Sequence, residues 1–174
     1  MKNQLLSLLL VFLSVPLLAQ DTKEKYAEIQ PLIDELYAVI SGPPGARDWD
    51  LFKSLFHANG TMGAIRTPQE GENSFAYFTP EGYIERSGAM LEKNGFFEEE
   101  IANKKLIYGG VAQVFTAYQY RFKADGPIER TGINCIQLAF EKGRWWITNI
   151  IWEATTEGNP LPRWAKKAQK KKKK

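Results

Sequence analysis

The chain has 174 residues, of which 44% are hydrophobic and 13% are aromatic. Its formal charge of +3 depends on eight lysines near the two ends of the chain, namely Lys2, Lys166, Lys167 and Lys170 to Lys174. Without them, 15 basic residues stand against 20 acidic ones, a charge of about −5. This balance argues against a basic nucleic-acid-binding face, and the remaining length suits one domain with a hydrophobic core.

Residues 1–20 have the layout of a secretory signal peptide. Lys2 gives a basic start, an apolar run follows from Leu5 to Leu18, and Ala19-Gln20 offers a small-residue cleavage site. A transmembrane anchor is the alternative, but the run is shorter than the ~20 apolar residues that a spanning helix needs. The sequence therefore predicts an exported protein, periplasmic or secreted, with no membrane span.

The predicted domain, residues 21–158, begins with helical patterns. Asp21 to Glu24 has the spacing of a capping box. Apolar residues then recur at helical spacing, at Tyr26, Ile29, Ile33, Leu36, Tyr37 and Ile40. Pro31 either kinks this helix or restarts it, and the segment 41–45 ends it.

Two more helices are predicted downstream. Asp48 caps a short helix with a strongly apolar face that includes Trp49. Thr79, followed by proline and glutamate, starts a third helix that runs to about Lys93. The three helices thus come early in the chain.

Strand patterns fill the rest of the domain. A first strand is predicted at residues 60–65, with a polar loop at residues 67–74. From Phe96 the period alternates, and strands are predicted near residues 96–107, 110–123, 129–141 and 144–155. The last two form a hairpin around Lys142-Gly143. The predicted fold class is α+β, with three N-terminal helices packed on an antiparallel sheet.

The end of the chain, residues 159–174, follows turn residues at Gly158-Asn159-Pro160 and is rich in lysine. We expect a disordered tail, because charge runs are usually solvated. The alternative is a patch that binds anionic lipid or a cell-wall polymer.

Metal and disulfide chemistry find little support in the sequence. Cys135 is the single cysteine, so no internal disulfide can form, and its strand neighbours indicate a buried thiol. His57 is the only histidine, and no ligand cluster at metal spacing accompanies it. No metal or cofactor is therefore expected.

The chain resembles the nuclear transport factor 2-like superfamily, also called SnoaL-like, over residues 24–155. The resemblance rests on residues 37–56, on residues 79–98 and on the closing strand that starts at Arg144. It implies a cone, in which helices close one end of a strongly curved antiparallel sheet around a deep apolar cavity. Members include isomerases, cyclases, dehydratases, epoxide hydrolases and proteins with no known reaction, so this fold does not decide the function.

A ketosteroid isomerase of this superfamily uses a strand carboxylate as its base, and a tyrosine and a protonated acid stabilise the enolate. Tyr37 matches the tyrosine. The base would fall near Ala64 and the late acid near residues 134–136, where no acid occurs. The comparison argues against this isomerisation, and Tyr37 has the alternative role of a core residue with a satisfied hydroxyl.

Three residues are candidates for acid–base chemistry, namely Glu99, His57 and Tyr37. Alternation within Glu98-Glu99-Glu100 places Glu99 on the inner face, where an apolar site would raise its pKa. His57 follows an apolar helix and could serve as a base at the mouth of the cavity. The alternatives are a solvated acid at the sheet edge and a turn histidine.

Alternation along the late strands predicts an inner face with many aromatic and few polar side chains, as in small-molecule pockets. On the last strand it places Trp146, Thr148, Ile150 and Trp152 inside. The predicted ligand-binding residues are Tyr37, Trp49, Tyr118, Asn134, Ile136, Thr148, Ile150 and Trp152. An ordinary packed core gives the same stripes, and the excess of Trp and Tyr is the argument for a cavity.

Three functions remain open at this stage. The first is non-catalytic binding of a small hydrophobic or aromatic molecule in the cavity. The second is an enzyme of the dehydratase, isomerase or cyclase type that uses acid–base groups there. The third is a homodimer paired through the outer sheet face, driven by Trp145, Ile147 and Ile151. The missing carboxylates favour the first.

Overall fold

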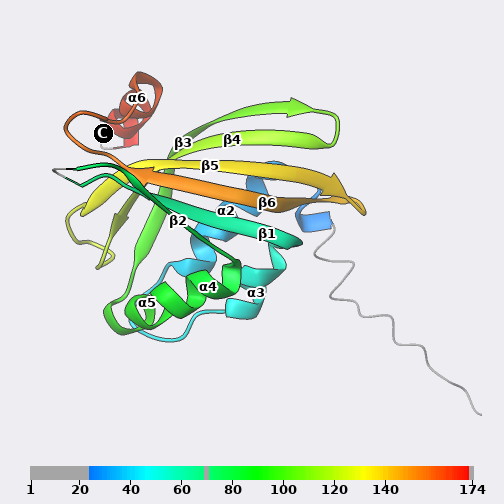
Figure 1. Cartoon of the computed structure of the whole chain (residues 1–174), viewed down its shortest axis with the longest axis horizontal. Coiled ribbons are helices and arrows are strands. Elements are labelled where there is room, and N and C mark those ends of the chain that lie inside the picture. Colours follow the sequence, from blue (N-terminus) through cyan, green and yellow to red (C-terminus); the bar gives the residue numbers. More distant parts are fainter. Residues whose placement is uncertain (1–23, 69–70, 173–174) are drawn as a thin grey trace, which may run out of the picture.

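A computed structural model describes residues 24–68 and 71–172, so the predicted signal peptide and residues 21–23 of the capping box lie outside the described residues. Six strands form one sheet in the order β2-β1-β6-β5-β4-β3 (Figure 1). The strands are β1 (Phe56–Arg66), β2 (Ser74–Phe78), β3 (Phe97–Tyr108), β4 (Val111–Arg121), β5 (Arg130–Glu141) and β6 (Arg144–Ala154).

Helices lie on both sides of this sheet. They are α2 (Ile29–Ile40), α3 (Trp49–Ser54), α4 (Pro80–Tyr83), the π-helical turn η1 (Ile84–Gly88), α5 (Ala89–Asn94) and α6 (Arg163–Lys172). Figure 1 shows α3, α4 and α5 on one side and α6 on the other. We call the face that packs on α2 the inner face, and the face that packs on α6 the outer face.

The α+β class predicted from the sequence is confirmed, but the order and direction of the strands differ from the prediction in two details. The sheet is not wholly antiparallel, because β1 and β6 run parallel, with Met62 opposite Ile150 and Ala64 opposite Trp152. The predicted loop at residues 67–74 leads into a short edge strand, β2, that pairs with β1. Strand β2 has only five residues, and the side chains of Phe75 and Tyr77 are exposed. Its alternation of apolar and polar residues is therefore too weak to predict a strand.

Local signals in the sequence set the helix boundaries. The Asp48 carboxylate accepts a hydrogen bond from the Leu51 N–H at 2.8 Å, so it caps α3 as predicted. The Thr79 hydroxyl accepts one from the Gly82 N–H at 3.2 Å and caps α4, where Pro80 takes the first position. Gly95 ends α5 with φ of 74°, a conformation that favours glycine.

The core lies between α2 and the inner face. Leu32 and Ile33 of α2 are fully buried and belong to the same cluster as Val114 and Ile136 of the sheet. Burying four such side chains contributes roughly 1.5–3 kcal/mol each relative to exposure. This packing fixes α2 across the sheet and thereby positions Tyr37, which lies one turn after Ile33.

A bulge in β6 reverses the alternation that the sequence suggests. Asn149 lies opposite Gln137 and Ile147 lies opposite Leu138, so Thr148 is an extra residue on β6. Before the bulge the inner residues are Trp145 and Ile147, which are 7% and 0% exposed. The prediction that these two lie on the outer face is therefore wrong.

The same bulge moves Thr148 and Trp146 away from the inner face. The Thr148 hydroxyl donates a hydrogen bond to the Gln137 carbonyl at 3.1 Å, outside the core. The Trp146 Nε1–H donates to the Glu141 carbonyl at 3.1 Å. An inward position for these two residues is thus also a wrong prediction, because alternation holds only while every residue of a strand is paired.

Within residues 159–174, where the sequence suggests a disordered tail, Arg163–Lys172 form the helix α6. Leu161 and Ala165 are buried against Ile101 and Ala117 of the outer face. Trp164 and Ala168 pack around them. These apolar residues recur at helical spacing between lysines, so the helix is stabilised by packing on the sheet rather than by its own composition.

Candidate functional site

A cavity of about 230 Å³ opens between α2, the η1–α5 segment and the inner face of the sheet. Most of its wall is apolar, with Leu36, Ile40, Phe52, Met62, Ile150 and Trp152 among the lining residues. Met90 and Phe122 also line it and are 42% and 37% exposed, so they mark its rim. A concave apolar site with few polar groups is the usual form of a small-molecule pocket.

The carboxyl group in this cavity belongs to Glu98. Glu98 lies opposite Tyr120 on β4, whereas Glu99 lies opposite Gln119. On the outer face, the Glu99 carboxylate accepts a hydrogen bond from Gln119 Nε2 at 2.7 Å and pairs with Arg121 Nη2 at 3.1 Å. The inward position predicted for Glu99 is therefore wrong by one residue.

The sequence contains a pattern that places Glu98, rather than Glu99, on the inner face. Phe96 is buried, and a strand residue two positions later faces the same side, which places Glu98 inside. A bulge at Ile101 then interrupts the alternation, so that Ile101 and Ala102 both pack on the outer face beside α6. Counting the strand from its apolar start, rather than from the centre of the acidic run, identifies Glu98.

Burial raises the pKa of the Glu98 carboxyl from 4.5 to about 8, and a hydrogen bond from Asn134 opposes this rise only in part. Among the described residues that line the cavity, none is a Lys, Arg or His that could hold the carboxylate form. At neutral pH the carboxyl group is therefore mostly protonated and can donate a hydrogen bond into the cavity.

Two tyrosines share the cavity with Glu98. Tyr83 of α4 and Tyr118 of β4 both line it, and burial raises the pKa of each hydroxyl well above its ordinary value. Their hydroxyls therefore stay protonated at any physiological pH. Together with the Glu98 carboxyl they supply O–H donors within a largely apolar wall.

Tyr37 lines the cavity, as predicted, but its hydroxyl belongs to a hydrogen-bonded chain. Asn134 Nδ2 donates to Tyr37 Oη at 2.9 Å, and Tyr37 Oη lies 2.9 Å from Thr116 Oγ1. Thr116 gives its one proton to Glu100 at 2.7 Å, so Tyr37 must donate to Thr116. The Tyr37 proton is thus engaged within the protein, and burial raises the pKa of the hydroxyl further from neutrality.

Five of the eight predicted ligand-binding residues line the cavity, namely Tyr37, Tyr118, Asn134, Ile150 and Trp152. The other three do not. Ile136 is wholly buried in the core, and Thr148 is displaced by the bulge. The Trp49 ring packs edge-on against Phe52, and its Nε1–H donates to Glu92 Oε1 at 2.7 Å.

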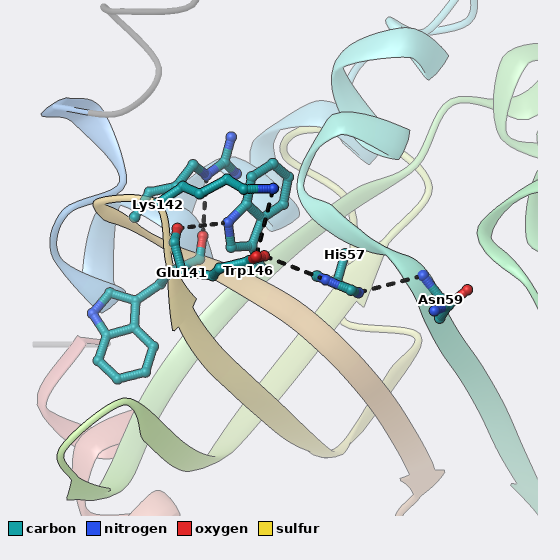
Figure 2. Close-up of polar contacts among 7 residues, drawn as sticks. His57, Asn59, Glu141, Lys142 and Trp146 are labelled. Carbon is teal, nitrogen blue, oxygen red and sulfur yellow. Dashed lines mark hydrogen bonds and ion pairs between the residues drawn. The ribbon is translucent and has the colours of Figure 1, made fainter.

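His57 lies away from the cavity, at the start of β1. Figure 2 shows its ring beside Glu141, Trp146 and Asn59. His57 Nε2 is 3.5 Å from Glu141 Oε2, and its Nδ1 accepts a long hydrogen bond of 3.5 Å from the Asn59 N–H. The structure therefore does not bring His57 together with Tyr37 or Glu98, and the turn interpretation describes its surroundings better.

The described residues contain no group of three His, Cys, Asp or Glu side chains that could hold a metal ion. Cys135 lies on the outer face, where Gln113 Nε2 contacts its Sγ at 2.8 Å and burial raises the pKa of the thiol. This environment disfavours the thiolate, the form that acts as nucleophile or ligand.

No protein-family model and no curated protein matches the chain. Solved structures do share its fold. A nuclear transport factor 2-like protein with a cystatin-like fold from Novosphingobium aromaticivorans aligns with a TM-score of 0.59 and 12% identity, covering 91% of this chain and 98% of that one.

Two proteins of unknown function give similar alignments. One from Nostoc punctiforme, with a cystatin-like fold, has a TM-score of 0.54 at 15% identity over 72% of this chain and 90% of its own. One from Mycobacterium tuberculosis has a TM-score of 0.54 at 16% identity over 85% and 82%. The chain thus has the fold of the nuclear transport factor 2-like proteins, and at these identities the likeness extends to the fold alone.

Proposed function

We propose that this protein, folded as the nuclear transport factor 2-like proteins are, binds one small neutral molecule in the cavity beside Glu98. The observation that carries the proposal is the position of the Glu98 carboxyl group in an apolar wall without a cation, where burial raises its pKa to about 8. Such a group donates a hydrogen bond to a carbonyl or hydroxyl oxygen and disfavours a carboxylate ligand, whose charge would be buried without a cation.

The size of the cavity limits the ligand. An apolar cavity of about 150 Å³ holds a benzene molecule, so a cavity of about 230 Å³ suits one substituted ring. Trp152 lies edge-on to Phe78 and to Tyr83, which gives that part of the wall aromatic edges and faces. The proposed ligand class is therefore a neutral aromatic or alicyclic compound with one hydrogen-bond acceptor.

Binding of three probes tests this class. Acetophenone carries a ring and a carbonyl, toluene lacks the acceptor, and benzoate replaces it with a charge. We expect quenching or shift of tryptophan fluorescence, since Trp152 lines the cavity, with the affinity order acetophenone, toluene, benzoate at neutral pH. Native mass spectrometry of protein purified gently from its own host would then identify the natural compound.

Two variants give a matched comparison. Glu98→Leu should weaken acetophenone binding about tenfold, the loss of one good hydrogen bond, and leave toluene binding nearly unchanged. Glu99→Gln alters the neighbouring carboxylate on the opposite face and should change neither. Equal binding of all three probes by all three proteins, or no saturable binding of any probe by the wild type, would contradict the proposal.

An acid–base enzyme is the second candidate, and the same pKa of about 8 favours it. A carboxyl group that titrates near the working pH can both take and return a proton. In D₂O, ionised Glu98 would remove a methyl proton of bound acetophenone to give the enolate, exchange that proton for deuterium from the solvent, and return the deuterium to the carbon. Deuterium incorporation followed by NMR, abolished by Glu98→Gln and kept by Glu99→Gln, would establish this activity, and its absence would leave binding as the function.

A further inference from the structure

Charge is strongly segregated between the domain and its C-terminal helix. Residues 21–162 carry 14 Lys and Arg against 20 Asp and Glu, a formal charge of −6. Residues 163–174 carry eight Lys and Arg and no acid, a charge of +8. A densely basic C-terminal segment therefore follows an acidic domain.

Packing of α6 on the sheet determines which way this charge faces. Ala165 is fully buried on the outer face, and Gln169 Nε2 donates a hydrogen bond to Gln119 Oε1 at 3.0 Å. Arg163, Lys166 and Lys167 occupy the opposite side of the helix and are exposed. Residues three and four apart share a helix face, so these three cations form one surface, which we call the basic face.

Among the described residues, the basic face has no acidic side chain as a counter-ion. Within residues 24–68 and 71–172, no ion pair involves Arg163, Lys166 or Lys167. The apolar residues of the helix are already used, because Trp164, Ala165 and Ala168 pack on the sheet. The helix thus offers a partner positive charge but little apolar surface to insert.

We propose that the basic face of α6 adsorbs this protein onto anionic phospholipid membranes. A flat bilayer touches the basic end while the acidic domain points away, and each Lys or Arg near the surface strengthens partition about fivefold. A nucleic acid fits less well, because its contacts would extend over a domain of charge −6. Among the described residues, no helix is long and apolar enough to cross a membrane.

Co-sedimentation with vesicles tests the proposal on the mature full-length chain. We use phosphatidylcholine vesicles with and without about 30% phosphatidylglycerol. We expect binding only to the anionic vesicles, with a loss of at least tenfold when salt rises from about 0.05 M to 0.5 M. The triple variant Arg163→Gln, Lys166→Gln, Lys167→Gln should lower the partition coefficient about a hundredfold.

A second triple variant controls for net charge. Lys93, Lys123 and Lys142 are exposed on other parts of the domain, and their change to Gln removes the same charge. It should weaken partition less than threefold, with both variants keeping the wild-type thermal midpoint. Equal losses in the two triple variants would overturn the proposal, as would wild-type binding to neutral vesicles or tighter binding to poly(A) RNA than to the anionic vesicles.

Discussion

Asn134 and Tyr37 are joined by a hydrogen bond of 2.9 Å that connects strand β5 to helix α2 across the core. The Asn134 amide also donates to Glu98, so one side chain links the Tyr37 network to the carboxyl group in the cavity. Because Asn134 is 8% exposed, neither contact is replaced easily by water. The polar groups of the site are therefore held by the same interactions that hold α2.

The first prediction concerns the Tyr37 hydroxyl. Tyr37→Phe removes the hydroxyl that accepts a hydrogen bond from Asn134 and donates one to Thr116. Asn134 and Thr116 are both buried and would lose this partner. We expect the free energy of unfolding to fall by about 1–3 kcal/mol, the cost of buried polar groups without partners. Urea denaturation measures the change, with Tyr77→Phe as the control, since Tyr77 is 59% exposed. Similar stabilities of the two variants would show that the chain of hydrogen bonds does not stabilise the fold.

The second prediction is a dependence of stability on pH. The pKa of Glu98 is about 8 in the folded protein and near 4.5 when exposed, so the folded state holds an extra proton between these values. Stability should therefore be full below about pH 4.5, fall as the pH rises, and reach a lower plateau above about pH 8. After allowing for water in the cavity, we expect a decline on the order of 3 kcal/mol.

Two substitutions identify the group responsible for this decline. Glu98→Gln keeps the shape of the side chain but removes the titratable carboxyl group. The stability of this variant should therefore not decline between about pH 4.5 and pH 8, and it should exceed that of the wild type at about pH 9. Glu99→Gln should keep the slope, because Glu99 lies on the outer face beside Arg121. If the stability of the Glu98→Gln variant still declined between about pH 4.5 and pH 8, the decline would have to be assigned to other groups.

Most of the fold could be predicted from the sequence because the residues that form turns and helix caps act locally. The four late strands begin and end within about two residues of the predicted bounds, since turns such as Lys142-Gly143 require particular residues. Asp48 and Thr79 fixed two helix starts for the same reason. These signals depend on a few neighbouring residues and on no long-range contact.

The site was harder to predict because strand bulges are set by distant pairing. The extra residue at Thr148 reversed the inner and outer faces of half of β6, and it has no distinctive sequence signature. The choice of Glu99 over Glu98 failed in the same way, by one residue of register. A single error of this kind moves every side chain of a segment to the other face.

The third prediction concerns Gly132, which makes room for Tyr118. A Cβ atom at Gly132 would lie 2.4 Å from the Glu153 carbonyl oxygen and 2.4 Å from the Tyr118 hydroxyl. Gly132→Ala should therefore lower the free energy of unfolding by about 1–3 kcal/mol and displace Tyr118 from the cavity wall. Urea denaturation and acetophenone titration measure the two effects. Gly158→Ala, which meets no atom within 4 Å, should produce neither; a wild-type-like Gly132→Ala protein would refute the role of this glycine.

The fourth prediction concerns Arg144, a cation that is 4% exposed. Its guanidinium lies 4.5 Å from the Tyr26 ring centre and 3.9 Å from that of Trp146, and it donates to the carbonyls of Trp145 and Ser54. A lysine cannot stack as a plane or keep this geometry, so we expect Arg144→Lys to cost about 2–4 kcal/mol of stability. Urea denaturation measures this loss. The control is Arg130→Lys, which should change the free energy of unfolding by less than about 0.5 kcal/mol because Arg130 is exposed. If Arg144→Lys were as stable as Arg130→Lys, the stacked guanidinium would not stabilise the junction between β6 and the start of the domain.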